Sequence, residues 1–122
     1  MSHRAAERGS VSVVCAAAIC IALVCTMGVA DAGRVLVERS HAEAAADAAA
    51  LAAAQDLALG TGDPAATATR FAKDNGAALV GCSCAPGAAE AVVTVRRTFT
   101  GLLLVPGSLA VQARARAVVA LP

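Results

Sequence analysis

The chain has 122 residues, of which 58% are hydrophobic, but only two are phenylalanine and none is tryptophan or tyrosine. This length allows one small domain at most, and alanine, which supplies much of the apolar count, buries little surface per residue. We therefore expect a marginally stable domain that depends on its long helix or on partner subunits. The formal net charge of +1, without a concentrated basic face, gives no reason to expect nucleic-acid binding.

The first element is a long uncharged run, Gly9–Ala30. At about 1.5 Å of rise per helical residue it is long enough to cross a hydrocarbon core of roughly 30 Å. A helix of these small apolar and hydroxyl residues satisfies its backbone groups internally, as a bilayer requires. We therefore predict a transmembrane helix over residues 9–30 that packs laterally in the membrane. Its expected packing positions are Gly9, Ser10, Val14 and Gly28.

Charged residues on either side of this run predict its orientation. Arg4 and Arg8 precede the run, and Asp31 follows it at once. Basic residues are enriched on the cytoplasmic side of membrane spans. We therefore expect residues 1–8 to form a disordered cytoplasmic arm and residues 31–122 to form an extracytoplasmic domain of a single-pass protein of the cell membrane.

A cleaved signal peptide is the alternative for the same run. The segment Ala30-Asp31-Ala32 has the small-x-small form that signal peptidase prefers, and a basic arm stands in front of the run. The apolar stretch is, however, longer than the roughly 7–15 residues usual for a signal-peptide core. This length favours a retained anchor over a small secreted binding module that is released by cleavage near Ala32.

Alanine dominates residues 31–59, and this composition predicts that the membrane helix continues into water. Two oppositely charged pairs at i,i+4 spacing favour the same helix; they are Arg34 with Glu38 and Arg39 with Glu43. Small side chains allow another backbone to approach closely. The alanine-rich run is therefore either a solvent-exposed surface helix or a helix–helix interface. The interface positions would be Ala45, Ala49 and Ala52.

A second, shorter helix follows the glycine-rich segment at residues 60–62. Asp63-Pro64 has the order of a helix start, an N-cap acceptor followed by proline at the first helical position. The helix should extend to about Asn75 and end at Gly76. Its apolar residues recur at helical spacing, and we expect Phe71 to be its main core residue.

Beyond Gly76 the pattern changes to that of strands. Ala78–Cys84, Ala91–Phe99 and Leu109–Val119 are rich in valine and threonine or alternate apolar with polar residues. In the third, alternation predicts one buried and one solvated face. We predict an α+β, pilin-like fold: a long N-terminal helix, transmembrane and then soluble, a second short helix and a small antiparallel three-stranded sheet.

Five cysteines are the first candidates for chemistry. Cys15, Cys20 and Cys25 lie in the apolar run, where thiols behave as small apolar residues. Cys82 and Cys84 should share one face of the first strand, with Cα atoms near the upper limit for a disulfide. Buried free thiols are the expected state of this pair, and an intermolecular disulfide is the alternative, since cysteines of exported proteins can pair between chains.

Neither a catalytic nor a metal-binding pattern accompanies these cysteines. A structural metal site needs about four ligands, whereas His3 and His41 lie far apart and neither is near Cys82 in sequence. The sequence has no phosphate-binding glycine loop and no nucleophile–base motif. We therefore predict that the protein is not an enzyme and that it binds no metal, cofactor or small-molecule substrate.

Two segments of the N-terminal half carry a family resemblance. Arg8-Gly9-Ser10 precedes the apolar run, and Arg39–Ala52, which contains AADAAALA, follows it. This arrangement resembles the TadE/TadG-like proteins of the tight-adherence (Flp) pilus machinery. The second half is similar to an actinobacterial subgroup encoded near secretion genes, through Asn75-Gly76-Ala77, Leu79, Cys82, Val92–Val95 and Ala113–Ala117 in that order.

The resemblance implies a minor pilin or an accessory subunit that acts structurally in a pilus assembly or secretion system. Its partners would be the membrane and other pilin-like or Tad secretion subunits. In prepilins of this type, cleavage follows a glycine and uses a glutamate five residues on. Here Gly9 is present, but Val14 occupies the glutamate position. We therefore expect a retained anchor, and an accessory subunit before a filament subunit.

Overall fold

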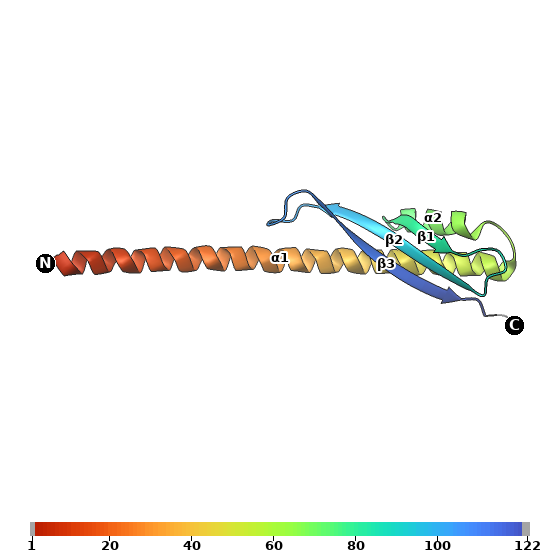
Figure 1. Cartoon of the computed structure of the whole chain (residues 1–122), viewed down its shortest axis with the longest axis horizontal. Helices are drawn as coiled ribbons and strands as arrows, with labels where there is room; N and C mark the ends of the chain where they lie inside the picture. The colour runs from red at the N-terminus through yellow and green to blue at the C-terminus, as the bar shows by residue number, and fades with distance from the viewer. Residues whose placement is uncertain (1, 121–122) are drawn as a thin grey trace.

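The computed structural model describes residues 2–120, with side chains from residue 9 onward. One continuous helix, α1 (Ser2–Leu59), comprises 58 residues and is about 87 Å long. Figure 1 shows it running the length of the molecule, with every other element beside its C-terminal half. The prediction of a single helix that ends at Leu59 is confirmed.

The expected disorder of the N-terminal arm is wrong from Ser2 onward, where α1 begins. The physical reason is that extending an existing helix needs no new nucleation, and the arm contains good helix formers such as Ala5, Ala6 and Glu7. The expectation for Met1 lies outside the described residues.

The second helix, α2 (Pro64–Asp74), begins as predicted. The Asp63 carboxylate accepts hydrogen bonds from the amides of Ala65 (3.1 Å) and Ala66 (3.2 Å), which satisfies two of the unpaired donors at a helix start. The expectation for Phe71 is wrong, because its side chain is 36% exposed. The buried positions of α2 are Pro64, Ala68 and Ala72.

Three antiparallel strands follow in the order β1-β2-β3: β1 (Ala78–Ser83), β2 (Glu90–Thr100) and β3 (Ser108–Val118). Their bounds differ from the predicted ones by one residue at the ends. β2 and β3 pair without interruption along their length, whereas the β1–β2 register shifts between Leu79 and Gly81. The predicted α+β class, with two helices and a three-stranded antiparallel sheet, is confirmed.

One face of the sheet packs on α1, and α2 lies beside both α1 and β1. The predicted alternation of β3 is confirmed, since Ala113, Ala115 and Ala117 are buried while Gln112, Arg114 and Arg116 are exposed. Val93 and Val95 of β2 are the largest side chains that are fully buried. The core is therefore thin, and it depends on close approach of the sheet to α1.

The alanine-rich face of α1 supplies the other side of this core. Ala45 and Ala49 are completely buried, and Ala52 is 9% exposed. The sheet and α2 of the same chain contact this part of α1. Ala45 and Ala49 belong to the core that α1 forms with the sheet and α2 of the same chain, whose close approach their small side chains allow. Of the two predicted alternatives, a solvent-exposed surface helix is wrong at these buried positions.

Candidate functional site

The N-terminal half of α1 is the clearest candidate for a functional surface. The stretch that begins at Gly9 is long and apolar enough to cross a membrane, and its most apolar window has no buried residue. Val13, Val14 and Ile21 are 69%, 64% and 65% exposed. The other described residues therefore do not bury this half of the helix, and its apolar side chains are available for contacts outside the chain.

The small residues predicted to pack in the membrane differ in their surroundings. A Cβ atom at Gly9 would meet nothing within 4 Å, whereas one at Gly28 would lie 3.7 Å from Leu104 Cδ1. Ser10 and Val14 are exposed on the same helix. Gly28 thus faces a loop of its own chain, and the other three positions stay predicted membrane-packing sites.

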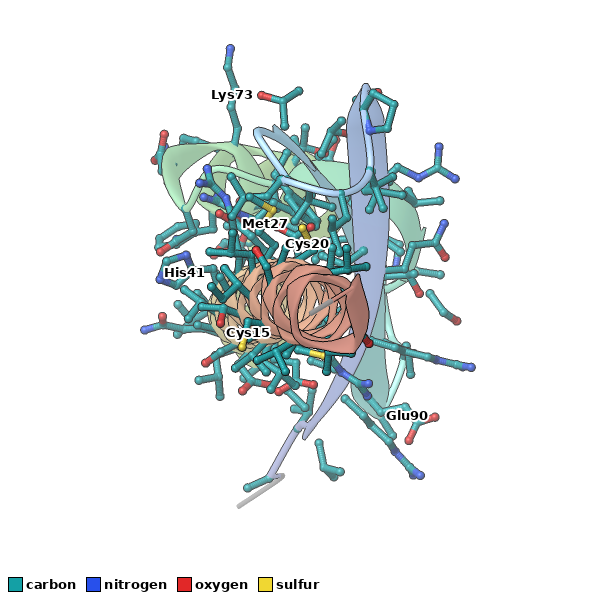
Figure 2. The ribbon with its side chains drawn as sticks, turned by 90° about the vertical axis from the view of Figure 1, so that its left-hand side faces the viewer. Cys15, Cys20, Met27, His41, Lys73 and Glu90 are labelled. Atoms are coloured by element: carbon teal, nitrogen blue, oxygen red, sulfur yellow. A yellow bond between two sulfur atoms is a disulfide. The ribbon has the colours of Figure 1, made fainter. Side chains whose placement is uncertain are left out.

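The three cysteines of the apolar run are free and exposed. Viewed along α1, Cys15 and Cys20 lie on different sides of the helix (Figure 2), as expected because a five-residue step turns about 140°. The hydroxyl of Thr26 donates to the Ala22 carbonyl at 2.8 Å. Such back-bonding removes an unpaired polar group from an apolar helix surface.

Asp31, the first charged residue after the run, holds the β2–β3 loop (residues 101–107) against α1. Its Oδ1 accepts from the Leu103 amide at 2.7 Å and its Oδ2 from the Leu104 amide at 2.8 Å. The residue is only 9% exposed, and the two amides compensate its desolvation. In the sequence, Asp31 stood out only as the charge that follows the apolar run and as part of Ala30-Asp31-Ala32. This contact was not predicted, because it joins residues 72 and 73 positions apart.

An ion pair joins the next part of α1 to the sheet. Glu38 Oε2 accepts from Arg97 Nε at 2.5 Å, and Arg97 Nη1 donates to the Gly76 carbonyl at 2.8 Å. The predicted pair of Glu38 with Arg34 is replaced by this contact, while the predicted pair of Arg39 with Glu43 forms at 3.1 Å. The hydrogen bond from Arg97 lowers the pKa of Glu38 below its ordinary value of 4.5, against the opposing effect of desolvation.

This lowered pKa predicts acid sensitivity. The ionised Glu38 stabilises the folded state above its ordinary pKa of 4.5, and the contribution is lost as the pH falls through the lower folded-state pKa. At pH 6 the variant Glu38→Gln should therefore have a lower thermal midpoint than the wild type, and the gap should close on acidification. Thermal unfolding of the full chain in detergent measures both midpoints.

The matched control is Glu43→Gln. Its ion pair with Arg39 is solvent-exposed, with side-chain exposures of 66% and 57%, and such pairs contribute little. The midpoint of this variant should stay near that of the wild type between pH 6 and pH 3. A Glu38→Gln protein with the same pH dependence as the wild type would contradict the role of the Glu38 carboxylate.

An open cleft of about 490 Å³ lies between α1 and the β2–β3 loop. Its charged lining residues are Asp31, Arg34 and Glu38, next to apolar residues of α1 and of the loop. Both carboxylates already bind groups of the chain, so they stabilise the fold. Among the described residues there is no group of three or more His, Cys, Asp or Glu side chains that could hold a metal ion.

Cys82 and Cys84 form a disulfide with each other. The predicted free thiols, and the alternative of an intermolecular bond, followed from a continuous strand, in which the two Cα atoms lie near the upper limit for a disulfide. The strand ends at Ser83, so Cys84 lies just beyond it, and the two Cα atoms are 5.4 Å apart, an ordinary separation for a disulfide. Both sulfur atoms are therefore engaged within the chain, and the intermolecular bond is corrected to an internal one.

Comparison with known proteins identifies a family for α1. Residues 9–56 match the family model described as "Putative Flp pilus-assembly TadE/G-like". No curated protein and no solved structure matches the chain. The matched segment contains the apolar run and most of the buried alanines, and the family it indicates is one of structural assembly. Residues 9–56 are thus similar to TadE/G-like Flp pilus-assembly proteins, and the predicted resemblance is confirmed over that segment.

Proposed function

We propose that the protein is a single-pass, membrane-anchored minor pilin or accessory subunit of a Flp/Tad-type pilus assembly or secretion system, and that it acts structurally rather than as an enzyme. The observation that carries this proposal is the division of α1. Its first half is apolar and lacks cover from the chain, and its second half forms the core of the domain. One continuous helix would thus connect the membrane span directly to the folded domain and fix the position of the domain relative to the membrane.

In this proposal residues 1–8 are cytoplasmic, residues 9–30 span the membrane and residues 31–122 form the extracytoplasmic domain. The internal disulfide supports this orientation, since disulfides persist outside the cytoplasm. The partners would be the membrane and other pilin-like or Tad secretion subunits. Gly9, Ser10 and Val14 would pack laterally in the bilayer, where small residues allow helices to approach closely.

Release by signal peptidase near Ala32 has less support. The segment Ala30-Asp31-Ala32 lies inside the continuous helix α1. A cut after Ala32 would separate Asp31 from the domain and remove both hydrogen bonds that hold the β2–β3 loop. The valine at position 14, where prepilins have glutamate, also favours an anchor that is kept whole.

Single-cysteine labelling in intact cells tests the proposed topology. The background would carry Cys15→Ala, Cys20→Ala and Cys25→Ala, and a membrane-impermeant maleimide would be applied without reductant. Ser108→Cys, at the start of β3, should react in intact cells, whereas Ser2→Cys should react only after lysis. The intact mass of the wild-type protein from the same membranes should match a chain that is uncut at Gly9 and at Ala32.

The reverse labelling pattern would overturn the orientation, and wild-type protein found free in the medium would support the secreted binding module. Copurification from the native membrane then tests the assembly role. Recovery of pilin-like or secretion subunits with the wild-type protein is expected. Their absence under conditions that preserve other membrane complexes would contradict it.

A further inference from the structure

The β2–β3 loop carries an apolar surface that the fold does not use. Its sequence is GLLLVPG, and Leu103, Leu104 and Val105 are 63%, 46% and 44% exposed. Loops that connect strands on a protein surface are normally polar. Four consecutive apolar residues from 102 to 105, three of them exposed, indicate a contact outside the chain.

In the structure this loop is held against α1 at the C-terminal end of the apolar run. The Asp31 carboxylate holds the amides of Leu103 and Leu104, and Asp31 is the first charged residue after the apolar run. Leu104 Cδ1 lies 3.7 Å from the Cβ position of Gly28, inside the run. In Figure 1 the loop is the part of the sheet that reaches furthest toward the N-terminal half of α1.

We propose that the β2–β3 loop is a second membrane contact, which inserts Leu103, Leu104 and Val105 into the outer leaflet beside α1. This inference rests on the proposed function, because it requires residues 9–30 to span the bilayer. The loop would hold the domain at a fixed tilt and rotation on the membrane surface, since a contact to one side of α1 restricts rotation about the helix axis in a way that the helix alone does not.

Two features favour a lipid surface over a protein partner. The loop's apolar residues are continuous with the apolar run of α1 through the contact of Leu104 with Gly28, so one apolar surface would meet one apolar medium. The guanidinium of Arg34 lies beside Gly101, one helical turn beyond Asp31, where it can meet lipid phosphate groups. The buried Asp31 brings no unsatisfied carboxylate oxygen to this boundary, because two loop amides donate hydrogen bonds to it.

Depth-dependent fluorescence quenching tests this contact. The full chain, in the background without free cysteines, would be reconstituted in phosphatidylcholine–phosphatidylglycerol vesicles with an environment-sensitive fluorophore at Leu103→Cys. The bonds to Asp31 use backbone amides, so the substitution leaves them in place. We expect a blue-shifted emission that is quenched by lipids spin-labelled near the headgroup and protected from aqueous iodide.

Two control positions separate this inference from the proposed anchor. A label on Cys20, kept as the single cysteine, should be quenched by lipid if residues 9–30 span the bilayer, and its failure would sink the proposed function itself. A label at Thr61→Cys, in the exposed turn after α1, should be quenched by iodide only. Lipid quenching at Cys20 with iodide quenching at Leu103→Cys would overturn the loop contact alone. Protection of Leu103→Cys from both quenchers would also overturn it, because protein, either the same chain or a second copy, would then cover the loop instead of lipid.

Discussion

Replacing Ala49 by leucine is expected to lower the free energy of unfolding by about 1–3 kcal/mol, the usual cost of overpacking a dense interior. Ala49 is completely buried on the face of α1 that the sheet and α2 cover. A leucine there adds three carbon atoms in a place where the backbones approach closely. Denaturant unfolding of the full chain in detergent, followed by circular dichroism, measures the change.

The matched control is Ala44→Leu, on the same helix. Ala44 is exposed, and substitutions at such positions usually change stability by less than about 0.5 kcal/mol. Leucine and alanine are both good helix formers, so the two variants differ mainly in what the new side chain meets. Equal stabilities for Ala49→Leu and Ala44→Leu would contradict the buried alanine face.

The sequence indicated Ala49, and not Ala44, as a position of a possible helix–helix interface, but it left open whether the run is buried at all. Alanine composition predicts helix whether the position is buried or exposed, and the run lacks the large apolar residues that mark a core-facing stripe. The identity of the partner surface comes from long-range pairing of α1 with β2 and β3. Sequence periodicity reports which face of an element is apolar, but not what covers it.

Local chemistry was predicted more successfully. The Asp63-Pro64 start of α2 and the alternation along β3 depend on neighbouring residues, and both predictions are confirmed. The prediction that Phe71 is the main core residue of α2 was wrong, because helical spacing alone does not say which apolar position is the most buried. Ala68 and Ala72 are smaller and permit closer packing on α1. The disulfide between Cys82 and Cys84 was not predicted, because its geometry depends on a strand that ends one residue earlier than predicted.

The apolar loop at residues 102–105 was missed although its signal is present in the sequence. Four apolar residues between two strands, followed by Pro106-Gly107, mark a turn with an unusual composition. Its position opposite Gly28 requires the contact with Asp31, which depends on the tertiary fold.

Charged substitutions in the proposed membrane anchor, residues 9–30, should have a second large effect, on membrane retention. The double variant Ile19→Arg/Leu23→Arg should abolish membrane retention, because each arginine near the centre of a span costs about 2.5–3.5 kcal/mol on insertion scales. Both side chains are more than half exposed on the apolar half of α1, so the folded domain should tolerate the change. Alkaline carbonate extraction measures the fraction of protein that stays in the membrane pellet.

The control for this variant adds the same charge outside the proposed span. Leu36→Arg/Leu51→Arg replaces two leucines of α1 that are each 66% exposed, beyond the apolar run. This protein should remain in the pellet, as the wild type should. Release of the wild-type protein from the pellet by alkaline carbonate would contradict an integral membrane anchor. Retention of Ile19→Arg/Leu23→Arg would show that something other than residues 9–30 holds the domain at the membrane, and the β2–β3 loop would then be the first surface to test.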